Sequence, residues 1–370
     1  MGAIAEKPIR VLLIAPSMDI LGGQAVQAVR LLAGLKQEPS LEMAFQPINP
    51  RLPRPLRFLQ KIKYVRTIAT FLLYNLMLFS RAPRHDVLHV FSAGLWSYTL
   101  WSIPALAATK LYRKKMLLHY QDGQCEQHLR EFRSAKPTIR RADLLITPSG
   151  FLVDVFARHG LPARYIFNVM DFSHFHYRER RKLRPVLMTN RILEPLYNVE
   201  CILRAFAIIQ ERYPEASLTI AHDGPSGPVL EKLASDLKLR NTRFIGRVPH
   251  DQVGKLYDSA DIYLTTPNVD CMPGSILECF VSGLPVVATE AGGIPYISEN
   301  ERTALLVPIN DHQAVADRAF RLLEDEELVS RLTAAAREDV KKYDWSYLRG
   351  QWVEAYRELR DSPGRSNTIY

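Results

Sequence analysis

Two carboxylates, Asp270 and Glu278, lie eight positions apart in the C-terminal half of the chain. Between them, Pro273 and Gly274 are typical of the end of a loop, and Ser275 stands near the start of a predicted helix. The free amides of the first turn of a helix, together with the helix dipole, form a good seat for a phosphate. One acid would lie before this turn and the other inside the helix. The pair could therefore hold two distant parts of one long ligand.

The elements that must position these residues alternate between apolar runs and helical patterns. The first run, 11–15, ends at Pro16 and is typical of a strand buried on both faces, and Gly22 and Gly23 lead from it into a predicted helix. Further strands are predicted at 86–91, 115–120, 143–147, 165–169, 185–189, 217–221, 242–245, 261–265, 285–288 and 304–307. Repeated β-α units imply an α/β protein with two mostly parallel, doubly wound sheets.

A polar and strongly basic stretch, 171–184, separates the two series of strands and is typical of a surface linker. We therefore expect an N-terminal Rossmann-like domain at 1–172 and a C-terminal Rossmann-like domain at 173–345. A terminal helix and tail at 346–370 are expected to pack back toward the N-terminal domain. Doubly wound sheets bind ligands at the carboxyl ends of their strands, so an interdomain cleft is the expected site.

The positive charge of the chain is concentrated in its N-terminal half. Residues 1–170 carry 23 Lys and Arg against 10 Asp and Glu, a net charge of +13, whereas the remainder carries 25 against 29, or −4. Within this half, 51–80 places six basic residues before an apolar run, which is typical of a helix lying on anionic lipid. The alternative is that Leu72, Leu73, Leu76 and Phe79 are ordinary core residues beneath a solvated basic face.

The remaining composition indicates a cytoplasmic protein. The four cysteines form no CxxC pair, and the sequence MGAIAEKPIR lacks the apolar run of a signal peptide. The longest uncharged apolar stretch near the front, 67–80, is too short for the roughly 20 residues that span a bilayer. We expect a peripheral attachment at the inner face of the membrane through 51–80. The cysteines and the 10 histidines show no spacing typical of metal ligands.

Ordered blocks of the C-terminal half resemble the retaining GT-B glycosyltransferases of family 4, the glycosyl transferases group 1. The Glu-x7-Glu motif of that family matches Asp270 and Glu278, and the surrounding MetPro, GlyLeuProValValAlaThr and AlaGlyGlyIlePro follow in its order. Further matching blocks are 198–206, HisAspGlyPro at 222–225, PheIleGlyArgVal at 244–248 and LeuLeuValPro at 305–308. The similarity is loose in the N-terminal half, where Gly22 and Gly23 resemble a diphosphate-facing glycine loop.

The resemblance implies the GT-B fold, with an acceptor-side N-terminal domain and a C-terminal domain that binds a nucleotide sugar. It also implies transfer of a sugar from a nucleotide diphosphate, a UDP-sugar in preference to a GDP-sugar, to an acceptor hydroxyl with retention of configuration. The acceptor would be a sugar or a lipid-linked molecule in the synthesis of cell-envelope polysaccharide or glycolipid. Since a phosphate oxygen of the donor would accept the acceptor's proton, neither metal nor cofactor is expected.

The resemblance further implies roles for individual residues. Asp270, one methylene shorter than the Glu of the family, would grip hydroxyls of the donor sugar with help from the backbone amides near 273–275. Glu278 would hold the ribose hydroxyls, and Arg191 would neutralise the leaving diphosphate. Gly23 would let its backbone approach the phosphates, because no Cβ stands in the way.

Besides the Asp at 270, two positions depart from the pattern of the family. The Lys expected five or six residues after Arg191 is missing, and Tyr197 or Asn198 could donate a neutral hydrogen bond to the donor in its place. The histidine of the N-terminal domain corresponds either to His119 or to Gln121, and we assign the catalytic role to His119.

Ordinary structural roles compete with these assignments. Glu278 could form a surface salt bridge, and Arg191 could form an interdomain salt bridge. Asp270 could cap a helix, and His119 could be a residue at a strand end whose hydrogen bonds are satisfied. The glycine pair could be an ordinary loop.

Three other functions compete with sugar transfer. The first is a NAD-dependent oxidoreductase, but the first β-α turn lacks the GxGxxG sequence of such enzymes. The sequence pI near 9.3 suits a nucleic-acid-binding protein, but no nucleic-acid-binding signature accompanies it. A family member that binds a nucleotide sugar or a partner without turnover stays open, because a lost cation removes transition-state stabilisation before it removes the fold.

Overall fold

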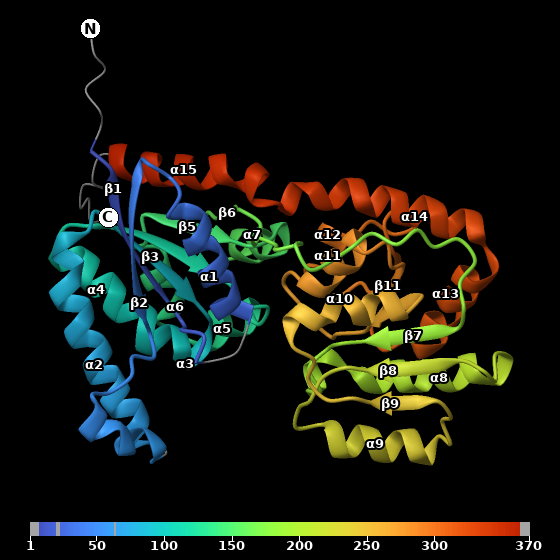
Figure 1. Ribbon diagram of the computed structural model, residues 1–370. Coiled ribbons are helices and arrows are strands. Elements are labelled where there is room, and N and C mark those ends of the chain that lie inside the picture. Colours follow the sequence, from blue (N-terminus) through green and yellow to red (C-terminus); the bar gives the residue numbers. More distant parts are fainter. Residues whose placement is uncertain (1–6, 20–22, 63, 363–370) are drawn as a thin grey trace, which may run out of the picture. The chain divides into compact units, whose positions relative to one another are not determined.

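The computed structural model describes residues 7–19, 23–62 and 64–362, which gather into two compact units (Figure 1). The first unit contains the chain up to Val169 together with the segment from Trp345 onward, and the second unit is Met170–Asp344. Each unit has a six-stranded sheet in which neighbouring strands pair in parallel. The prediction of an α/β protein with two doubly wound sheets is confirmed.

The strands of the first sheet lie in the order β2-β1-β3-β4-β5-β6. They are β1 (Ile9–Ala15), β2 (Leu41–Pro47), β3 (Val87–Ser92), β4 (Lys115–Tyr120), β5 (Leu144–Thr147) and β6 (Arg164–Tyr165). All of β3 is buried, as expected for a parallel strand covered on both faces. The edge strand β2 was not predicted because its burial is irregular, and the strand predicted at 165–169 is confined to β6.

Helices cover both faces of the first sheet. They are α1 (Gly23–Leu35), η1 (Arg54–Lys61), α2 (Val65–Arg81), η2 (Ala82–Arg84), α3 (Leu95–Ser97), η3 (Tyr98–Ser102), α4 (Ile103–Leu111), α5 (Cys125–Glu131), α6 (Ala135–Ile139), α7 (Gly150–Arg158) and α15 (Trp345–Asp361). The connections from β1 to β2 and from β3 to β4 run in opposite directions across the sheet. Because such connections are right-handed, α1 and α4 lie on opposite faces. α15 lies along the sheet and contacts α1 (Figure 1), and its Trp352 and Tyr356 are buried in their shared core.

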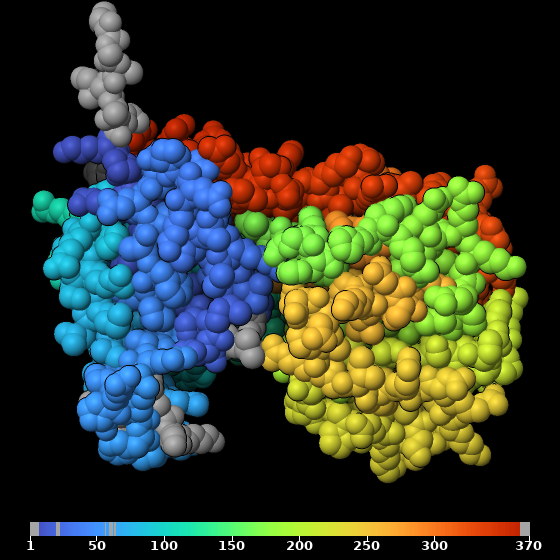
Figure 2. Space-filling view, in the orientation of Figure 1, coloured from blue at the N-terminus to red at the C-terminus, as the bar shows by residue number. Residues whose placement is uncertain are grey.

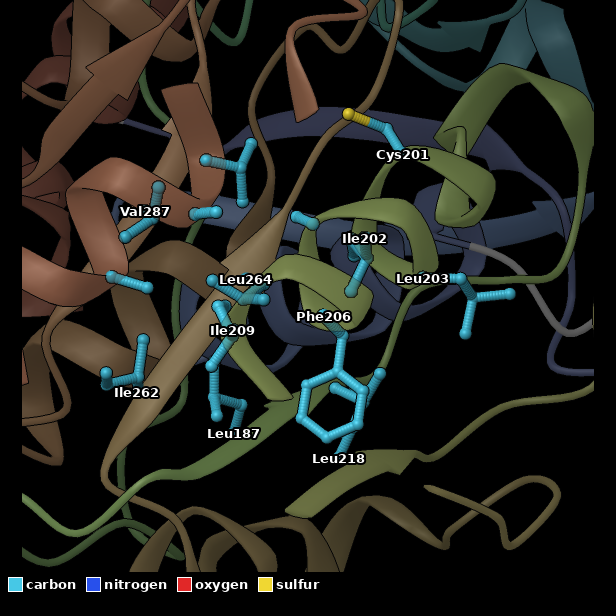
Figure 3. Packing of buried hydrophobic residues seen from close by; sticks show 14 of the residues in the cluster. Leu187, Cys201, Ile202, Leu203, Phe206, Ile209, Leu218, Ile262, Leu264 and Val287 are labelled. Carbon is cyan, nitrogen blue, oxygen red and sulfur yellow. The ribbon is translucent and has the colours of Figure 1, made fainter. Parts of the chain in front are cut away.

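The strands of the second sheet lie in the order β12-β11-β10-β7-β8-β9. They are β7 (Val186–Thr189), β8 (Ser217–Ile220), β9 (Thr242–Phe244), β10 (Ile262–Thr265), β11 (Val286–Thr289) and β12 (Leu305–Val307). The helices are η4 (Pro195–Tyr197), α8 (Val199–Arg212), α9 (Gly227–Asp236), α10 (His250–Ser259), α11 (Gly274–Val281), α12 (Ile294–Ile297), α13 (His312–Glu324), α14 (Glu326–Asp339) and η5 (Val340–Tyr343). In the core, Phe206 and Ile209 of α8 lie against Leu187, Leu218 and Leu264 of the strands (Figure 3).

The basic stretch 171–184 differs from the surface linker that its composition predicts. The side chain of Arg180 is buried and donates hydrogen bonds to the carbonyls of Ala260, Ser282 and Tyr257, at 3.2, 2.6 and 2.7 Å. The carbonyl of Arg178 is a fourth acceptor, at 3.1 Å, and burial lowers the pKa of the guanidinium to about 10. This stretch is therefore part of the second unit.

Each sheet reverses its strand order at one point, and the carboxyl ends of the strands on either side of that point leave a crevice for ligands. In the first sheet this point lies between β1 and β3, and in the second it lies between β7 and β10. The predicted residues Arg191 and Asp270 follow β7 and β10 along the chain. The topology therefore accounts for their meeting, although they are 79 positions apart.

Candidate functional site

The switch point of the second sheet brings three predicted residues together. The guanidinium of Arg191 forms an ion pair with the carboxylate of Asp270, and each side chain is 12% exposed. Its Nη1 also donates to the Oγ of Ser275 over 3.3 Å. The competing assignments of an interdomain salt bridge to Arg191 and of a cap to Asp270 do not apply to these contacts. The ion pair lies within the second unit, and the N-cap of α11 is Pro273.

The loop that carries Asp270 is held by the glycine pair of AlaGlyGlyIlePro. The amide of Gly293 donates to the carbonyl of Asp270 over 2.6 Å. Gly292 has a φ of +56°, and a Cβ on it would collide with that carbonyl, while a Cβ on Gly293 would collide with the carbonyl of Cys271. The carboxylate of Asp270 also accepts from the amide of Met272 over 3.2 Å. The loop thus holds Asp270 in one place before the helix.

Helix α11 begins at Gly274, one residue before Ser275, as the sequence predicts. Its first turn contains no acidic residue, and no side chain caps its amides. The first amides are therefore available to an anion, and the dipole favours one there. The helix ends before Gly283, whose φ of +62° is the left-handed conformation expected of a glycine that ends a helix.

Glu278 lies in α11 and is 8% exposed. It accepts a hydrogen bond from the hydroxyl of Tyr257 over 2.9 Å, and the Nε2 of His250 lies 3.4 Å from its other carboxylate oxygen. Behind it, Asn190 donates to the Tyr257 hydroxyl over 2.8 Å and accepts from the hydroxyl of Tyr263 over 2.7 Å. Burial raises the pKa of both tyrosines, which therefore stay neutral donors. Glu278 is thus held by a buried network and not by a surface salt bridge.

Arg191 keeps its charge in this setting. Burial lowers the pKa of the guanidinium, but the carboxylate of Asp270 and the neighbouring Tyr263 and Tyr197 together raise the pKa above its ordinary value. The ring of Tyr197 stacks on the same guanidinium, with the Cζ of Arg191 4.3 Å from the ring centroid. The Nε of Arg191 is buried and has no hydrogen-bond partner among the described residues. A buried donor without a partner is unusual in a folded protein.

The two residues proposed to replace the missing lysine point to different partners. Tyr197 packs on Arg191 through its ring, so it supports the first cation instead of adding a second. Asn198 has a φ of +46°, and its side-chain amide donates to Asn310 over 2.7 Å and to Asn268 over 3.3 Å.

His119 lies in the first unit, near the end of β4, and is buried. Its Nδ1 contacts the Nε2 of His89 at 3.2 Å, and its Nε2 contacts the side-chain amide of Gln121 at 2.9 Å. The same amide nitrogen of Gln121 donates to Asn168 over 2.8 Å, and His89 contacts the hydroxyl of Tyr356 at 2.7 Å. Both ring nitrogens of His119 are therefore engaged. Burial lowers its pKa to about 3, so the ring is neutral at pH 7.

The N-terminal glycine pair is described only in part. Gly22 lies outside the described residues. Gly23 is the first residue of α1, and a Cβ built on it would meet nothing within 4 Å. Among the described residues, no group of three or more His, Cys, Asp or Glu could hold a metal ion.

Residues 170–339 match the family described as "Glycosyl transferases group 1". The second unit, which contains all of the matched residues, is therefore a domain of the glycosyl transferases group 1. Among curated relatives, the chain is 30% identical to the sulfoquinovosyl transferase SQD2 of Arabidopsis thaliana over 220 residues, which are 56% of this chain and 42% of the relative. It is 32% identical to the D-inositol 3-phosphate glycosyltransferase of Corynebacterium urealyticum over 180 residues, 46% of this chain and 42% of the relative. The match to a phosphatidyl-myo-inositol mannosyltransferase of Mycobacterium leprae is 30% identical and covers 48% of each chain. The chain spans less than half the length of these relatives.

Solved structures of similar fold cover almost the whole chain. The Anabaena protein Alr3699/HepE in complex with UDP has a TM-score of 0.74 at 17% identity, over 95% of this chain and 100% of that chain. Sucrose-phosphate synthase from Thermosynechococcus elongatus has a TM-score of 0.75 at 17% identity, over 95% and 99% of the two chains. The fold of the chain is GT-B, as the sequence predicts.

Sequence reasoning missed the residues that support the site in this group 1 domain. Tyr257 and His250 both face Glu278, and they lie seven positions apart in α10, on one side of that helix. That spacing was a usable signal. Asn190 stands directly before Arg191 and joins Tyr257 to Tyr263, a role that depends on strand order and had no signal in the sequence.

Proposed function

We propose that this protein transfers a sugar from a UDP-sugar to an acceptor hydroxyl with retention of anomeric configuration. The observation that carries the proposal is the meeting of Arg191, Asp270 and Ser275 at the switch point of the second sheet, directly before the uncapped first turn of α11. A fixed cation, free amides and a carboxylate are the groups that a diphosphate and a sugar hydroxyl require.

In the proposed reaction the diphosphate of the donor binds between the guanidinium of Arg191 and the first amides of α11. Asp270 accepts hydrogen bonds from hydroxyls of the donor sugar, and Glu278 accepts them from the ribose. The bond between the anomeric carbon and the diphosphate breaks while the acceptor oxygen bonds to the same face of that carbon. The acceptor's proton passes to an oxygen of the leaving diphosphate. Arg191 stabilises the charge that develops on the leaving group.

The buried network around Glu278 supports its proposed role. Because the buried Tyr257 donates to one carboxylate oxygen and His250 lies near the other, the rotamer of Glu278 is restricted before any ligand arrives. A carboxylate has about four acceptor positions, so lone pairs are left for two ribose hydroxyls. Preorganisation of this kind lowers the entropic cost of binding.

The environment of His119 supports a proton route that does not use it. Its ring is neutral, and both nitrogens are occupied within the first unit. Gln121, which is 9% exposed, is the member of the pair nearer to the surface. We therefore assign substrate contact in this unit to Gln121, and we assign to His119 the role of positioning it.

Binding of nucleotides is the first test of this proposal. We expect UDP to raise the unfolding temperature of the second unit more than GDP does, because a ligand that binds only the native state stabilises it by mass action. All four tryptophans, 96, 101, 345 and 352, belong to the first unit, so the measurement needs calorimetry and not tryptophan fluorescence. If neither nucleotide shifts the transition of the second unit, the proposal fails. If UDP binds but UDP-sugars are never turned over, the alternative of a binding protein without catalysis is correct.

The buried histidines of the first unit predict acid sensitivity. Burial lowers the pKa of His119 to about 3 and that of His128 to about 4, whereas both return to about 6.5 in the unfolded chain. At a pH between the folded and the unfolded pKa of each histidine, the unfolded chain binds a proton that the folded chain does not. The free energy of unfolding should therefore fall as the pH falls below 6.5, by up to about 1.4 kcal/mol per pH unit for each histidine.

Urea titrations at pH 7 and pH 5, followed by tryptophan fluorescence, measure this loss in the first unit. His119→Gln should reduce the difference between the two pH values. His312→Gln removes an exposed histidine and should not change it. Equal free energies of unfolding at the two pH values would contradict the prediction.

The acceptor is proposed to be lipid-linked, because α2 presents an apolar face to solvent. Ile68, Leu72 and Leu76 are 61%, 63% and 70% exposed, whereas Tyr74 and Leu78 are buried against the unit. Treating Leu72 and Leu76 as ordinary core is therefore wrong.

Exposed arginines stand beside this apolar face, at positions 54, 57 and 66 (Figure 2 shows η1 and α2 in mid-blue, at the lower left). Arg51 is paired with Asp19 and contributes less. Exposed apolar and basic side chains together fit the interface of an anionic membrane. None of the helices among the described residues is both long and apolar enough to cross a membrane. The name of the mycobacterial relative, which includes a phosphatidylinositol, supports a lipid acceptor.

Vesicle flotation tests the membrane surface. We expect binding to vesicles of phosphatidylcholine with phosphatidylglycerol, weaker binding to phosphatidylcholine alone, and release by high salt. Leu72→Gln with Leu76→Gln should reduce binding at least about tenfold, since each buried Leu contributes about 1.5–3 kcal/mol. Val229→Gln, which changes a residue 70% exposed on α9, is the matched control. Equal flotation with both kinds of vesicle, unchanged by salt, would contradict the proposed binding of this surface to an anionic membrane.

A further inference from the structure

The loop after β3 presents a tryptophan to solvent. Trp96 is 70% exposed, and it lies in α3, directly after the carboxyl end of β3. Since the first sheet reverses its strand order between β1 and β3, the ring stands at the edge where doubly wound sheets bind ligands. Figure 1 shows α3 at the same end of the sheet as the start of α1. An exposed aromatic side chain at this position is a candidate ligand contact.

The backbone that carries Trp96 is fixed from several sides. The amide of Gly94 donates to the carboxylate of Asp122 over 2.7 Å, and a Cβ on Gly94 would lie 2.7 Å from the hydroxyl of Tyr120. Leu95 has a φ of +55°, a left-handed conformation that costs a non-glycine residue about 1 kcal/mol or more. Strained backbone of this kind clusters at functional sites.

The indole itself is held by one edge contact. Trp96 meets the ring of Phe132 in a T-shaped arrangement, with centroids 5.5 Å apart and planes at 86°. Phe132 in turn meets the buried His128, which stacks on Tyr120. Since an edge contact covers little of the indole, most of the ring stays exposed while its orientation is restricted.

A carboxylate bound to the same loop restricts the chemistry of the ligand. Asp122 is fixed at the backbone two residues before Trp96, because one oxygen accepts from the amide of Gly94 and the other accepts from the amide of Gln124 over 2.9 Å. A fixed carboxylate disfavours phosphates and anionic headgroups and favours hydroxyl donors. A flat aromatic ring beside a hydroxyl acceptor fits a molecule with an apolar face and hydroxyls on its rim. A pyranose ring has both.

We propose that Trp96 is the stacking platform for a pyranose ring of the acceptor, with Asp122 accepting a hydrogen bond from one of its hydroxyls. This inference rests on the proposed function, since it names the part of the acceptor that the first unit recognises. It makes Trp96 a specificity-determining residue and not a catalytic one. The acceptor then carries a sugar ring near the hydroxyl that is glycosylated, whatever anchors its other end.

Saturation-transfer NMR tests the platform without turnover. The probes are the methyl α-pyranosides of glucose, mannose and galactose, with glycerol as a hydroxylated molecule that lacks a ring. We expect saturation of the protons on one face of at least one pyranoside and none for glycerol. Trp96→Ala should weaken binding at least about tenfold, and Trp96→Phe, which keeps an aromatic face, should stay within about threefold of the parent. Leu111→Ala removes an apolar residue that is 65% exposed at the far end of α4, and it should bind as the parent does.

Two outcomes would overturn the platform. One is equal binding of the pyranosides by the parent and Trp96→Ala, or no binding of any pyranoside by the parent. The other is a blue shift of the tryptophan emission on vesicles of phosphatidylcholine with phosphatidylglycerol that is present in the parent and lost in Trp96→Phe, which would place the ring in lipid. UDP binding, measured by calorimetry on every variant, separates this failure from that of the proposed function. If the parent does not bind UDP, the proposed transferase function is refuted. If the parent and Trp96→Ala bind UDP equally and also bind the pyranosides equally, only the platform is refuted.

Discussion

Asp270→Asn should abolish most of the turnover while leaving nucleotide binding intact or slightly tighter. The carboxylate forms an ion pair with Arg191, and both side chains are 12% exposed. Asparagine keeps the shape but removes the charge that we propose holds the donor sugar. Loss of one charged hydrogen-bonding group from a preorganised site costs about 10²–10³ in kcat.

The same substitution should strengthen the stabilisation of the protein by UDP, although it lowers turnover. Without its carboxylate partner, the charge of Arg191 is buried and uncompensated, which destabilises the free protein. The diphosphate restores a partner, so UDP should raise the unfolding temperature of Asp270→Asn by more than it raises that of the parent. Calorimetry with and without UDP, together with single-turnover kinetics, measures the two effects. Asp236→Asn, on the surface of α9, is the control for a lost carboxylate. Equal turnover, or loss of UDP binding together with turnover, would contradict the assigned role.

Glu278→Gln should weaken the binding of UDP at least about tenfold, because a hydrogen bond to a charged acceptor contributes about 1.5–3 kcal/mol. The fold should persist, since the amide oxygen of glutamine can still accept from the hydroxyl of Tyr257. The proposed contact is with ribose, so pyrophosphate, which has no ribose, should bind the variant as it binds the parent.

Calorimetric titration with UDP and with pyrophosphate separates a ribose contact from a general loss of the site. Glu200→Gln changes an exposed glutamate on α8 and should leave both affinities unchanged. If UDP and pyrophosphate weaken equally in Glu278→Gln, the residue supports the diphosphate region and not the ribose.

Much of the site was predictable because the relevant residues lie close together in the sequence. The helix beginning near Ser275 and ending before Gly283 follows from local signals, a loop-ending Pro-Gly and a terminal glycine. By contrast, the contact of Arg191 with Asp270 depends on β7 and β10 being neighbours, which no local pattern specifies.

Long-range register also decided what the sequence could not show in the first unit. His119 pairs in register with Phe91, and its ring meets His89, two residues earlier on the neighbouring strand. Neither the burial of this pair nor its contact with Tyr356 follows from the spacing of residues so far apart. The sequence left both a lipid-facing surface and ordinary core open for α2 for a related reason, because periodicity shows that a helix has two faces but not which one lies against the sheet.

The position of α15 has a consequence for how such chains can exchange parts. Because its Trp352 and Tyr356 complete the core of the first unit, the polypeptide passes between the units twice, after Val169 and after Asp344. Recombination that replaces the second unit must therefore exchange an internal segment, with one junction after Val169 and another after Asp344. A single splice that also replaced the final helix would leave the recipient with a foreign α15 against its own sheet, and matching side chains would have to evolve before that hybrid became stable.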